Sequence, residues 1–212
     1  MKLILIAPAG GGKGSLAELL CKEYNIPNIS TGDMLRKLIA EKNPVGIKAE
    51  PYVKGGHLVP DNIMADLVAE RVRAADCKNG CIFDGFPRTL GQAQSLIGKV
   101  QIDAVIELDI EDKLVMERLG GRWTDKVTGK IWNERYPNFA KAKASGNLFQ
   151  REDDNPAAIS KRLSDFRVNV KDILDFYKKQ GILFSVKIKP EFMPEDTYKI
   201  VKAHLDKLKS KR

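Results

Sequence analysis

Cysteine is scarce in this sequence. Cys21, Cys77 and Cys81 are the three cysteines among 212 residues, and no two of them form a C-x-x-C pair. An odd number of cysteines without paired spacing predicts neither a disulfide framework nor a zinc site. It favours a reducing compartment, so we expect the protein in the cytoplasm.

Long apolar runs are also missing. No run approaches the roughly 20 apolar residues that a membrane-spanning helix needs, and the first run covers only residues 3–7. That run is shorter than the core of about 7–15 residues in a secretory signal. The chain shows no repeat and no low-complexity segment. We therefore expect a globular chain with one sizeable core and room for an inserted subdomain.

Charge is abundant, with 36 Lys and Arg against 28 Asp and Glu, a formal net charge of +8. A basic balance favours anionic partners such as nucleic acid, acidic lipid or phosphorylated small molecules. The alternative is a solvated lysine-rich surface, and the C-terminal segment KAHLDKLKSKR accounts for part of the excess.

Predicted strands alternate with predicted helices along the chain. Apolar runs predict strands at residues 2–6, 80–85, 103–110 and 182–188. Helical periodicity or end signals predict helices at 13–24, 31–42, 61–75, 89–99, 111–121, 160–180 and after Pro194. Between residues 122 and 159 the apolar periodicity fades. This order predicts an α/β fold with a doubly wound parallel sheet, whose ligands bind at the carboxyl ends of the strands.

The segment GGGKGS at residues 10–15 joins the first predicted strand to a helix. Glycines allow backbone N–H groups to turn around an anion, the helix N-terminus favours negative charge, and Lys13 adds a mobile cation. The segment departs from the pattern G-x-x-x-x-G-K-[ST] because Ala7 occupies the first position. If that position requires a positive φ angle, alanine costs about 1–2 kcal/mol. Two interpretations remain, a phosphate-binding loop and a tight strand-to-helix turn.

Further motifs follow in a characteristic order: GGGKGS (10–15), ISTGDMLR (29–36), GHLVPD (56–61), DGFPRT with Gln92 (84–92), GGRW (120–123), TGKIWN (128–133) and QREDDN followed by KRL (150–163). Together they resemble the adenylate kinases, nucleoside monophosphate kinases of the bacterial type with a long lid. The resemblance runs from Met1 to the C-terminal helix.

The resemblance implies a P-loop NTPase-type core of residues 1–29, 60–121 and 160–212. It also implies two mobile inserts, a monophosphate-binding region at 30–59 and a lid at 122–159. The implied reaction is the reversible, Mg²⁺-dependent transfer of the terminal phosphoryl group of ATP to AMP, giving two ADP. We expect a monomer that has these nucleotides as its substrates and no nucleic-acid or membrane partner.

Site residues are implied by the same resemblance. The phosphoryl-transfer residues are Lys13, Arg88, Arg122, Arg151, Arg162, Asp153 and Asp154. The ATP-binding residues are Gly10, Gly11, Gly12, Lys13, Gly14, Ser15, Arg118, Arg122, Ile131, Trp132 and Lys189. The AMP-binding residues are Thr31, Arg36, His57, Leu58, Val59, Gly85, Phe86, Pro87, Arg88, Gln92, Arg151 and Arg162. Asp84, through water, and Asp33 are expected to hold magnesium.

The chemistry of the implied reaction explains why arginine and lysine are expected at this site. Phosphoryl transfer depends on positioning and charge neutralisation, and the planar fork of arginine grips phosphate oxygens in pairs. By resemblance, Arg36 and Arg88 hold the AMP phosphate, while Arg122, Arg151 and Arg162 close over the transferring group. Asp153 and Asp154 orient the lid arginines, and Arg118 stacks on the ATP adenine. For any single arginine the alternative is a surface ion pair.

Two features of the expected monophosphate-binding region bear on which nucleobase is accepted. Thr31 and Gln92 resemble adenine-reading residues, and Thr89 ends a motif that in UMP/CMP kinases typically ends in Asn. Both features favour AMP. His57 is interpreted as a pocket-edge residue, because the reaction requires no general base. Asp84 has an alternative role as an N-cap for the helix after Pro87.

The lid departs from its relatives. Residues 122–159 contain no cysteine, so we expect no structural zinc. Other lids use a hydrogen-bonded set of His, Ser, Asp and Thr. Only part of that set is visible in the matching region of this chain, which contains Thr124, Asp125 and Asn133. Trp132 either covers the nucleotide or belongs to the core of the lid. Gly120-Gly121 is a candidate hinge.

Three alternatives to an adenylate kinase stay open. They are a kinase for another nucleoside monophosphate, a catalytically silent nucleotide-binding protein and a nucleic-acid-binding protein. A GTPase switch is disfavoured because the N-K-x-D signature is absent.

Overall fold

The computed structural model describes residues 1–55 and 57–210. Gly56, the first residue of the GHLVPD motif, lies outside the described residues. The strands are β1 (Lys2–Ile6), β2 (Asn28–Ser30), β3 (Cys81–Asp84), β4 (Ala104–Asp109), β5 (Arg122–Asp125), β6 (Ile131–Asn133), β7 (Leu148–Phe149) and β8 (Leu183–Lys187). The helices are α1 (Lys13–Tyr24), α2 (Thr31–Ala40), α3 (Pro44–Lys54), α4 (Asp61–Val72), α5 (Leu90–Ser95), α6 (Asp112–Gly120), α7 (Phe139–Lys143), α8 (Pro156–Lys179) and α9 (Pro194–Lys209), with 3₁₀ turns at Ala75–Cys77 and Glu152–Asp154.

The core is a parallel sheet of five strands in the order β2-β3-β1-β4-β8. Side chains of β1 alternate between two apolar clusters, because successive residues of a strand face opposite sides. Leu3 and Leu5 belong to one cluster, and Ile4 and Ile6 belong to the other. A strand buried on both faces needs the uninterrupted apolar run that the sequence shows. The predicted α/β fold with a parallel sheet is confirmed.

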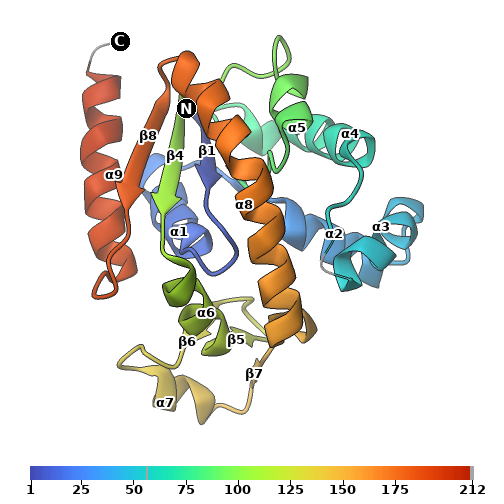
Figure 1. Ribbon diagram of the computed structural model, residues 1–212, viewed down its shortest axis with the longest axis vertical. Coiled ribbons are helices and arrows are strands. Elements are labelled where there is room, and N and C mark those ends of the chain that lie inside the picture. The colour runs from blue at the N-terminus through green and yellow to red at the C-terminus, as the bar shows by residue number, and fades with distance from the viewer. Residues whose placement is uncertain (56, 211–212) are drawn as a thin grey trace.

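Helices cover both faces of this sheet. Residues of α1, α6 and α9 join the cluster that contains Leu3, whereas residues of α4, α5 and most of α8 join the cluster that contains Ile4. Figure 1 shows α8 crossing in front of the sheet and α1 behind it. The strands all point toward one edge, so their carboxyl ends lie together.

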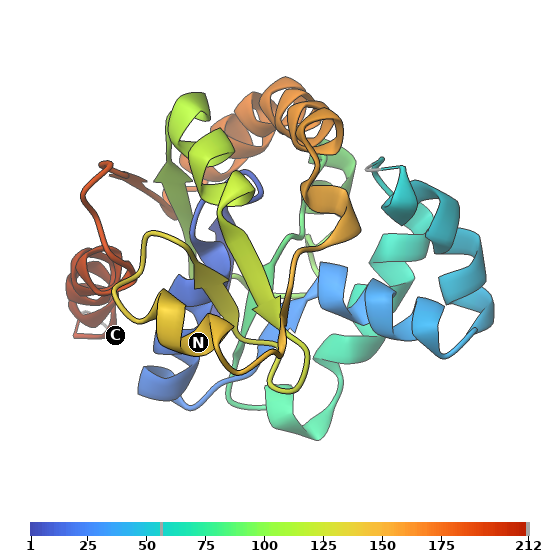
Figure 2. The same ribbon diagram turned by 90° about the horizontal axis from the view of Figure 1, so that it is seen from below.

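Two smaller units stand beside that edge. Strands β5, β6 and β7 form a separate antiparallel sheet in the order β6-β5-β7, which lies below the carboxyl ends of the core strands (Figure 1). Helices α2 and α3 pack together at the side of the molecule, as the view from below in Figure 2 shows. The site region is therefore bordered by three parts of the structure.

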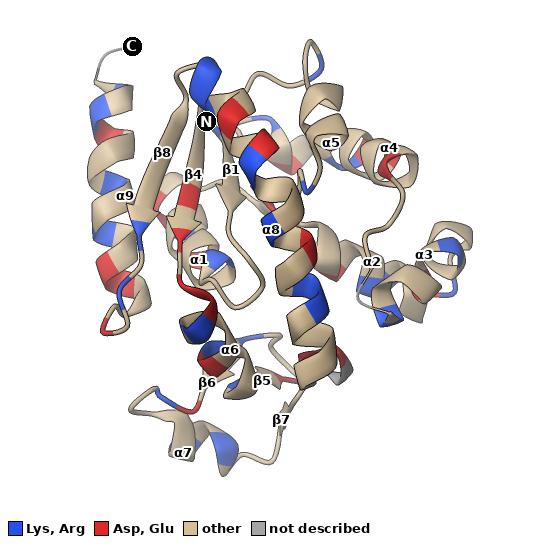
Figure 3. Ribbon diagram, in the orientation of Figure 1, with Lys and Arg blue, Asp and Glu red and all other residues tan. Residues whose placement is uncertain are grey.

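Acidic and basic positions are interspersed along α8 and α9 (Figure 3). Lys171 pairs with Asp175 at 3.0 Å and Lys202 with Asp206 at 2.6 Å, both at a spacing of four residues. Part of the basic excess is thus balanced locally on the surface. Within residues 1–55 and 57–210, no helix has the length and apolar character needed to span a membrane.

Several elements differ from the sequence prediction. The predicted helix at 89–99 shortens to α5 because the chain turns at Gly98, whose φ is 72°. Helix α8 begins at Pro156, inside the range expected for the lid. Helix α3 was not predicted, although it carries a start signal: the Asn43 side chain accepts from Val45 N at 2.9 Å and proline follows Asn43. The internal Pro51 obscures that signal.

The packing of α3 against α2 gives a first prediction. A Cβ atom on the buried Gly46 would lie 2.2 Å from the backbone oxygen of Leu38, so Gly46→Ala must push the two helices apart. We expect a loss of about 1–3 kcal/mol in the free energy of unfolding, measured by denaturant titration. The control is Val45→Ala on the same helix, where the side chain is 36% exposed. Equal stability of both variants would contradict the packing described here.

Candidate active site

The loop between β1 and α1 is shaped by its glycines. Gly10 and Gly12 have φ angles of 75° and 98°, which residues with a side chain rarely adopt. A Cβ atom on Gly11 would lie 2.7 Å from that of Ala7, so the loop folds tightly over the end of β1. Within the described residues no side chain caps α1, and the first N–H groups of this helix are open to an anion.

Ala7 occupies its position without backbone strain. Among the described non-glycine residues, only Asn25 and Lys42 have positive φ angles. The first position of the loop pattern therefore does not require glycine in this chain. The methyl group of Ala7 is accommodated because its neighbour Gly11 has no side chain.

Lys13 is held inside the loop. Its Nζ donates to the carbonyl oxygens of Ala7 at 2.7 Å and Pro8 at 3.0 Å. Removal from water lowers the pKa of Lys13 from 10.5 to about 8, while Asp84 opposes this shift and Arg88 adds to it. The ammonium group is thus an easily titrated cation at the centre of the site.

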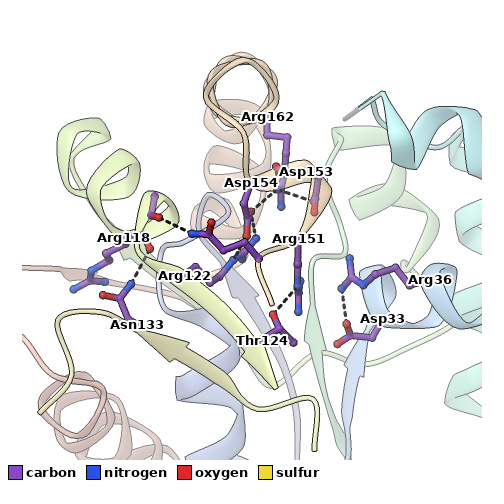
Figure 4. Close-up of polar contacts among 12 residues, drawn as sticks. Asp33, Arg36, Arg118, Arg122, Thr124, Asn133, Arg151, Asp153, Asp154 and Arg162 are labelled. Carbon is purple, nitrogen blue, oxygen red and sulfur yellow. Dashed lines mark hydrogen bonds and ion pairs between the residues drawn. The ribbon is translucent and has the colours of Figure 1, made fainter. Parts of the chain in front are cut away.

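A cavity of about 290 Å³ opens beside this loop. Five arginines predicted from the sequence line it together with Lys13, namely Arg36, Arg88, Arg122, Arg151 and Arg162. They come from α2, the loop after β3, strand β5, the end of the lid and α8. Figure 4 shows four of these side chains gathered from separate elements. The fold therefore concentrates cations at the carboxyl ends of the core strands, where α/β sheets bind ligands.

Carboxylates hold the lid arginines in place (Figure 4). Arg122 Nε donates to Asp154 Oδ2 at 2.7 Å, and Arg162 Nη1 donates to Asp153 Oδ2 at 2.8 Å. Arg162 Nη1 also lies 3.6 Å from Asp154 Oδ1, so two guanidinium groups share this carboxylate. These contacts support the predicted orienting role of Asp153 and Asp154.

The remaining arginines have weaker or more local partners. Arg36 pairs with Asp33 of its own helix. Arg151 Nε donates to the Thr124 hydroxyl at 3.1 Å, and Arg88 Nε donates to the carbonyl oxygen of Gly85 at 2.8 Å. Neither Thr124 nor a carbonyl group neutralises charge, so the cluster keeps a positive excess.

The pKa shifts report that excess. Burial, followed by repulsion from Arg36 and Arg122, lowers the pKa of Arg151 to about 10. Burial and neighbouring arginines also lower the pKa values of Arg88 and Arg162. Bringing several phosphate groups into the cavity would relieve this repulsion. The electrostatics therefore suit a polyanionic ligand.

Three acids share the cavity with these cations: Asp165 of α8 pairs with Lys161, and the other two are the predicted magnesium-holding residues. Asp84 ends β3 and Asp33 lies in the first turn of α2, and both line the space near Lys13. The alternative role of Asp84 as a helix cap is not observed, because Thr89 caps α5. Within the described ranges no three acidic, histidine or cysteine side chains cluster as a metal site. Mg²⁺ needs only one or two carboxylates when phosphate oxygens and water complete its shell, so this donor set fits it.

A smaller cavity of about 70 Å³ adjoins the first. It is lined by most of the residues predicted to bind AMP, which are Thr31, Arg36, His57, Leu58, Val59, Gly85, Arg88, Gln92 and Arg162. The Thr31 hydroxyl donates to the carbonyl oxygen of Gly85 at 3.0 Å, and Gln92 is only 2% exposed. Pro87 and Arg151 line the larger cavity instead. The two cavities share Arg36, Arg88 and Arg162.

Three predicted contacts lie away from both cavities. Trp132 stands between Ile131 and Asn133 on β6, and those two neighbours line the larger cavity while the Trp132 ring packs under Lys130. Its position follows from the alternation of side chains along a strand. Phe86 is buried in the core. Lys189 does not line the cavity; Phe192 and Met193 of the same loop and Pro194 at the start of α9 do.

The sequence reasoning missed Arg135 and Tyr136, which also line the larger cavity. Arg135 Nη2 donates to the carbonyl oxygen of Pro190 at 2.5 Å, and Arg118 Nη2 donates to that of Phe192 at 3.4 Å. These bonds tie the lid side of the site to the loop before α9. Arg135 and Tyr136 lie in the turn after β6, and no local sequence signal places them at the cavity.

A glycine loop at a strand–helix junction, its lysine and a ring of arginines define a nucleotide-binding phosphotransferase with a P-loop-type core. The family model described as "Adenylate kinase" matches residues 5–182 of the chain. The chain belongs to the adenylate kinase family.

Individual relatives agree with this assignment. The chain is 40% identical over 195 residues to proteins named "Adenylate kinase" from Listeria monocytogenes and Thermodesulfovibrio yellowstonii, and each match covers 88% of this chain and 91% of the relative. It is 37% identical over 219 residues to an "Adenylate kinase" from Archaeoglobus fulgidus, which covers 99% of this chain and all of the relative. The similarity therefore spans both the parallel sheet and the antiparallel sheet of β5, β6 and β7.

The lowered pKa of Lys13 gives a prediction for phosphate binding. Lys13 is cationic below about pH 8 and neutral above it, and only the cation attracts a terminal phosphate. We expect the affinity for ATP, measured by titration calorimetry, to fall as the pH rises through that value. In Lys13→Arg the guanidinium stays charged over this range, so the affinity should no longer depend on this titration. An equal fall in both proteins would assign the titration to another group.

The shared carboxylate of Asp154 gives a prediction for stability. Its side chain is 2% exposed and that of its partner Arg122 is 12% exposed. Asp154→Asn would leave the buried Arg122 without its counter-charge and Arg162 with Asp153 alone, and we expect the free energy of unfolding to fall by about 3 kcal/mol. The control is Asp175→Asn, which removes an exposed pair of α8 and should cost no more than about 0.5 kcal/mol. Similar losses in denaturant titrations of the two variants would contradict the burial of the Asp154 charge.

Proposed function

We propose that this protein catalyses the reversible transfer of the terminal phosphoryl group of ATP to AMP, giving two ADP. One observation carries the proposal: the arginines of the larger cavity extend into the smaller one, so two phosphorylated ligands meet at a shared set of cations. Membership of the adenylate kinase family supports the same reaction.

Each ligand has its own part of the site. The glycine loop and Lys13 hold the ATP phosphates, while Arg118, Ile131 and the loop before α9 enclose its base end. Arg36 and Arg88 grip the AMP phosphate, because they line both cavities. Arg122, Arg151 and Arg162 neutralise the group in transfer. The remaining predicted contacts, including Trp132 and Lys189, stay predictions that need a rearrangement to reach the ligand.

The chemical step follows from these positions. A phosphate oxygen of AMP attacks the terminal phosphorus of ATP, and the bond from that phosphorus to the bridging oxygen breaks. ADP leaves with the electron pair. The AMP phosphate already carries its charge at neutral pH because its second pKa is about 6, so no general base is needed. Lys13 and the arginines stabilise the charge that develops on the transferring oxygens.

Magnesium is part of the proposal, with Asp84 and Asp33 as the residues that would hold it, through water at Asp84. When bound, it would offset the negative charge of the phosphate groups. Within this chain Asp33 must then divide its carboxylate between that role and its ion pair with Arg36.

We further propose that residues 30–59 and 122–159 move as inserts on the core of residues 1–29, 60–121 and 160–212. Closing the lid over the nucleotides would exclude water, which competes as a phosphoryl acceptor. Gly120-Gly121 precedes β5 and is the proposed hinge. We also propose a cytoplasmic monomer; the three free cysteines suit a reducing compartment.

The test is separation of nucleotides after incubation of the protein with Mg-ATP and AMP, CMP, UMP or GMP in turn. We expect two ADP for each AMP consumed and little turnover of the other acceptors. Turnover of CMP or UMP instead would assign the protein to a sister kinase and overturn the proposed adenine-reading role of Gln92. Binding of ATP without turnover of any acceptor would indicate a silent nucleotide-binding protein.

A further inference from the structure

Asp61 is joined to the smaller cavity through Gln92, although the sequence reasoning assigned it no role. It is the first residue of α4, which lies beside α5 (Figure 1). Its Oδ1 accepts from Gln92 Nε2 at 2.8 Å, and its Oδ2 accepts from the Thr89 hydroxyl at 2.8 Å. One carboxylate thus contacts two of the three residues that the sequence linked to the choice of base, Thr89 and Gln92.

The amide of Gln92 is fixed from two sides. An ionised carboxylate can only accept hydrogen bonds, so the atom that faces Asp61 must be the amide nitrogen. The backbone N–H of Arg88 can only donate, and it lies 2.7 Å from Gln92 Oε1. Rotating the amide by half a turn would place Gln92 Oε1 against the Asp61 carboxylate, two acceptors. It would also place Gln92 Nε2 against the Arg88 N–H, two donors. Only one of the two amide orientations is therefore compatible with these neighbours.

The fixed amide still has bonding capacity. A glutamine amide has two N–H donors and two acceptor lone pairs, and Asp61 and Arg88 use one of each. The residue lines the smaller cavity together with Thr31 and Gly85. One N–H of Gln92 Nε2 and one lone pair of Gln92 Oε1 therefore remain available to a ligand. That pair matches adenine, which offers an amino donor beside ring-nitrogen acceptors.

A 6-oxo purine presents the opposite pattern. Hypoxanthine and guanine carry an acceptor at position 6 and an N–H donor at position 1, so they suit the amide only after it rotates. Discrimination between the two purine classes thus depends on whatever prevents that rotation. Buried polar groups left unpaired are the strongest source of such rejection.

We propose that Asp61 is a positioning residue that sets the preference for 6-amino over 6-oxo purine monophosphates by holding Gln92 in one orientation. The inference rests on the proposed function, since it concerns the acceptor in that reaction. Asp61 does not touch the base; it acts through the Gln92 amide.

Two neighbours keep Asp61 in place. The Thr89 hydroxyl donates to Asp61 and itself accepts from Gln92 N at 3.1 Å, which links the cap of α5 to the same carboxylate. A Cβ atom on Gly91 would lie 3.0 Å from Asp61 Oδ2, so the absence of a side chain there leaves room for this approach. Thr89 therefore influences base choice through Asp61 rather than by contact with the base.

A purely structural role is the competing interpretation. An acid in the first turn of a helix stabilises that helix through its dipole, and Asp61 occupies this position in α4. Removing it would then lower stability and affect all acceptors alike. The ratio of activities with AMP and IMP separates the two roles, because only the proposed role changes it.

The experiment compares Asp61→Asn with the wild-type protein. Asparagine keeps the shape, but its own amide accommodates either orientation of Gln92. The steady-state kcat and KM are measured for AMP and for IMP at saturating Mg-ATP. We expect the ratio of kcat/KM for AMP to that for IMP to fall about tenfold or more. The change should lie mainly in KM, because the arginines that hold the phosphate are unaltered.

Asp66→Asn is the matched control. Asp66 is exposed on the same helix, and its replacement changes the net charge equally, so the ratio should stay at the wild-type value. Thermal melts and the KM for ATP report folding. If Asp61→Asn is unfolded at the assay temperature, Thr89→Val, which removes the hydroxyl donor to Asp61, should lower the ratio in the same direction.

The outcomes separate the two proposals. A folded Asp61→Asn protein with an unchanged ratio, or with equal losses for both acceptors, would overturn the role of Asp61 and leave the proposed function intact. A wild-type protein that does not phosphorylate AMP would overturn the proposed function and this inference with it.

Discussion

Repulsion among like charges is the constraint on which this site depends. The parallel sheet brings Lys13 and the arginines to one edge, and the free energy of folding must absorb their mutual repulsion. Buried carboxylates, above all Asp154, offset part of it. They do not offset all of it: burial lowers the pKa values of Lys13 and Arg151 most, and repulsion from neighbouring arginines lowers them further. The cations that remain uncompensated attract phosphate groups. The same charges therefore lower the free energy of unfolding and strengthen ligand binding.

The same pairs connect the parts of the molecule. Asp154 lies in the 3₁₀ turn that leads into α8, and it contacts Arg122 of β5 and Arg162 of α8. A phosphate that attracts these arginines also acts on the segments that carry them. In contrast, Asp33 and Arg36 lie on one helix, and their separation requires only a change of side-chain conformation. The Asp154 pairs therefore join β5 to α8, whereas the Asp33–Arg36 pair joins no second segment.

The limits of the sequence prediction follow from the kind of signal each element carries. Strands β1, β3 and β4 are buried on both faces, so their apolar runs identify them. The lid strands are short and half-exposed, and no such run marks them. The cavity arginines were identified by their motifs and not by the elements that carry them, since β5 with Arg122 was not predicted. The positions of Trp132 and Lys189 depend on strand and loop geometry that the motifs do not encode. Asp61 was missed because its role is expressed only through Gln92.

The lid illustrates how a small unit is stabilised by the contacts that also serve the site. Trp123 packs against Phe139, lies under the Lys143 ammonium at 4.8 Å and donates to Glu134 at 2.9 Å. Thr124, Asp125 and Asn133, which the sequence analysis singled out, have different roles. Asp125 accepts hydrogen bonds from Val127 N and Thr128 N and so stabilises a turn. The Thr124 hydroxyl accepts from Arg151, and Asn133 Nδ2 donates to the carbonyl oxygen of Arg118 at 2.8 Å. Two of these three residues thus hold a cavity arginine or its backbone. An aromatic and cationic cluster supports the outer part of this lid, and its polar residues are free to orient the arginines. Stability of this unit and alignment of the site are consequently separable by mutation, since the first rests on Trp123 with Phe139 and Lys143 of α7 and the second on Thr124 and Asn133.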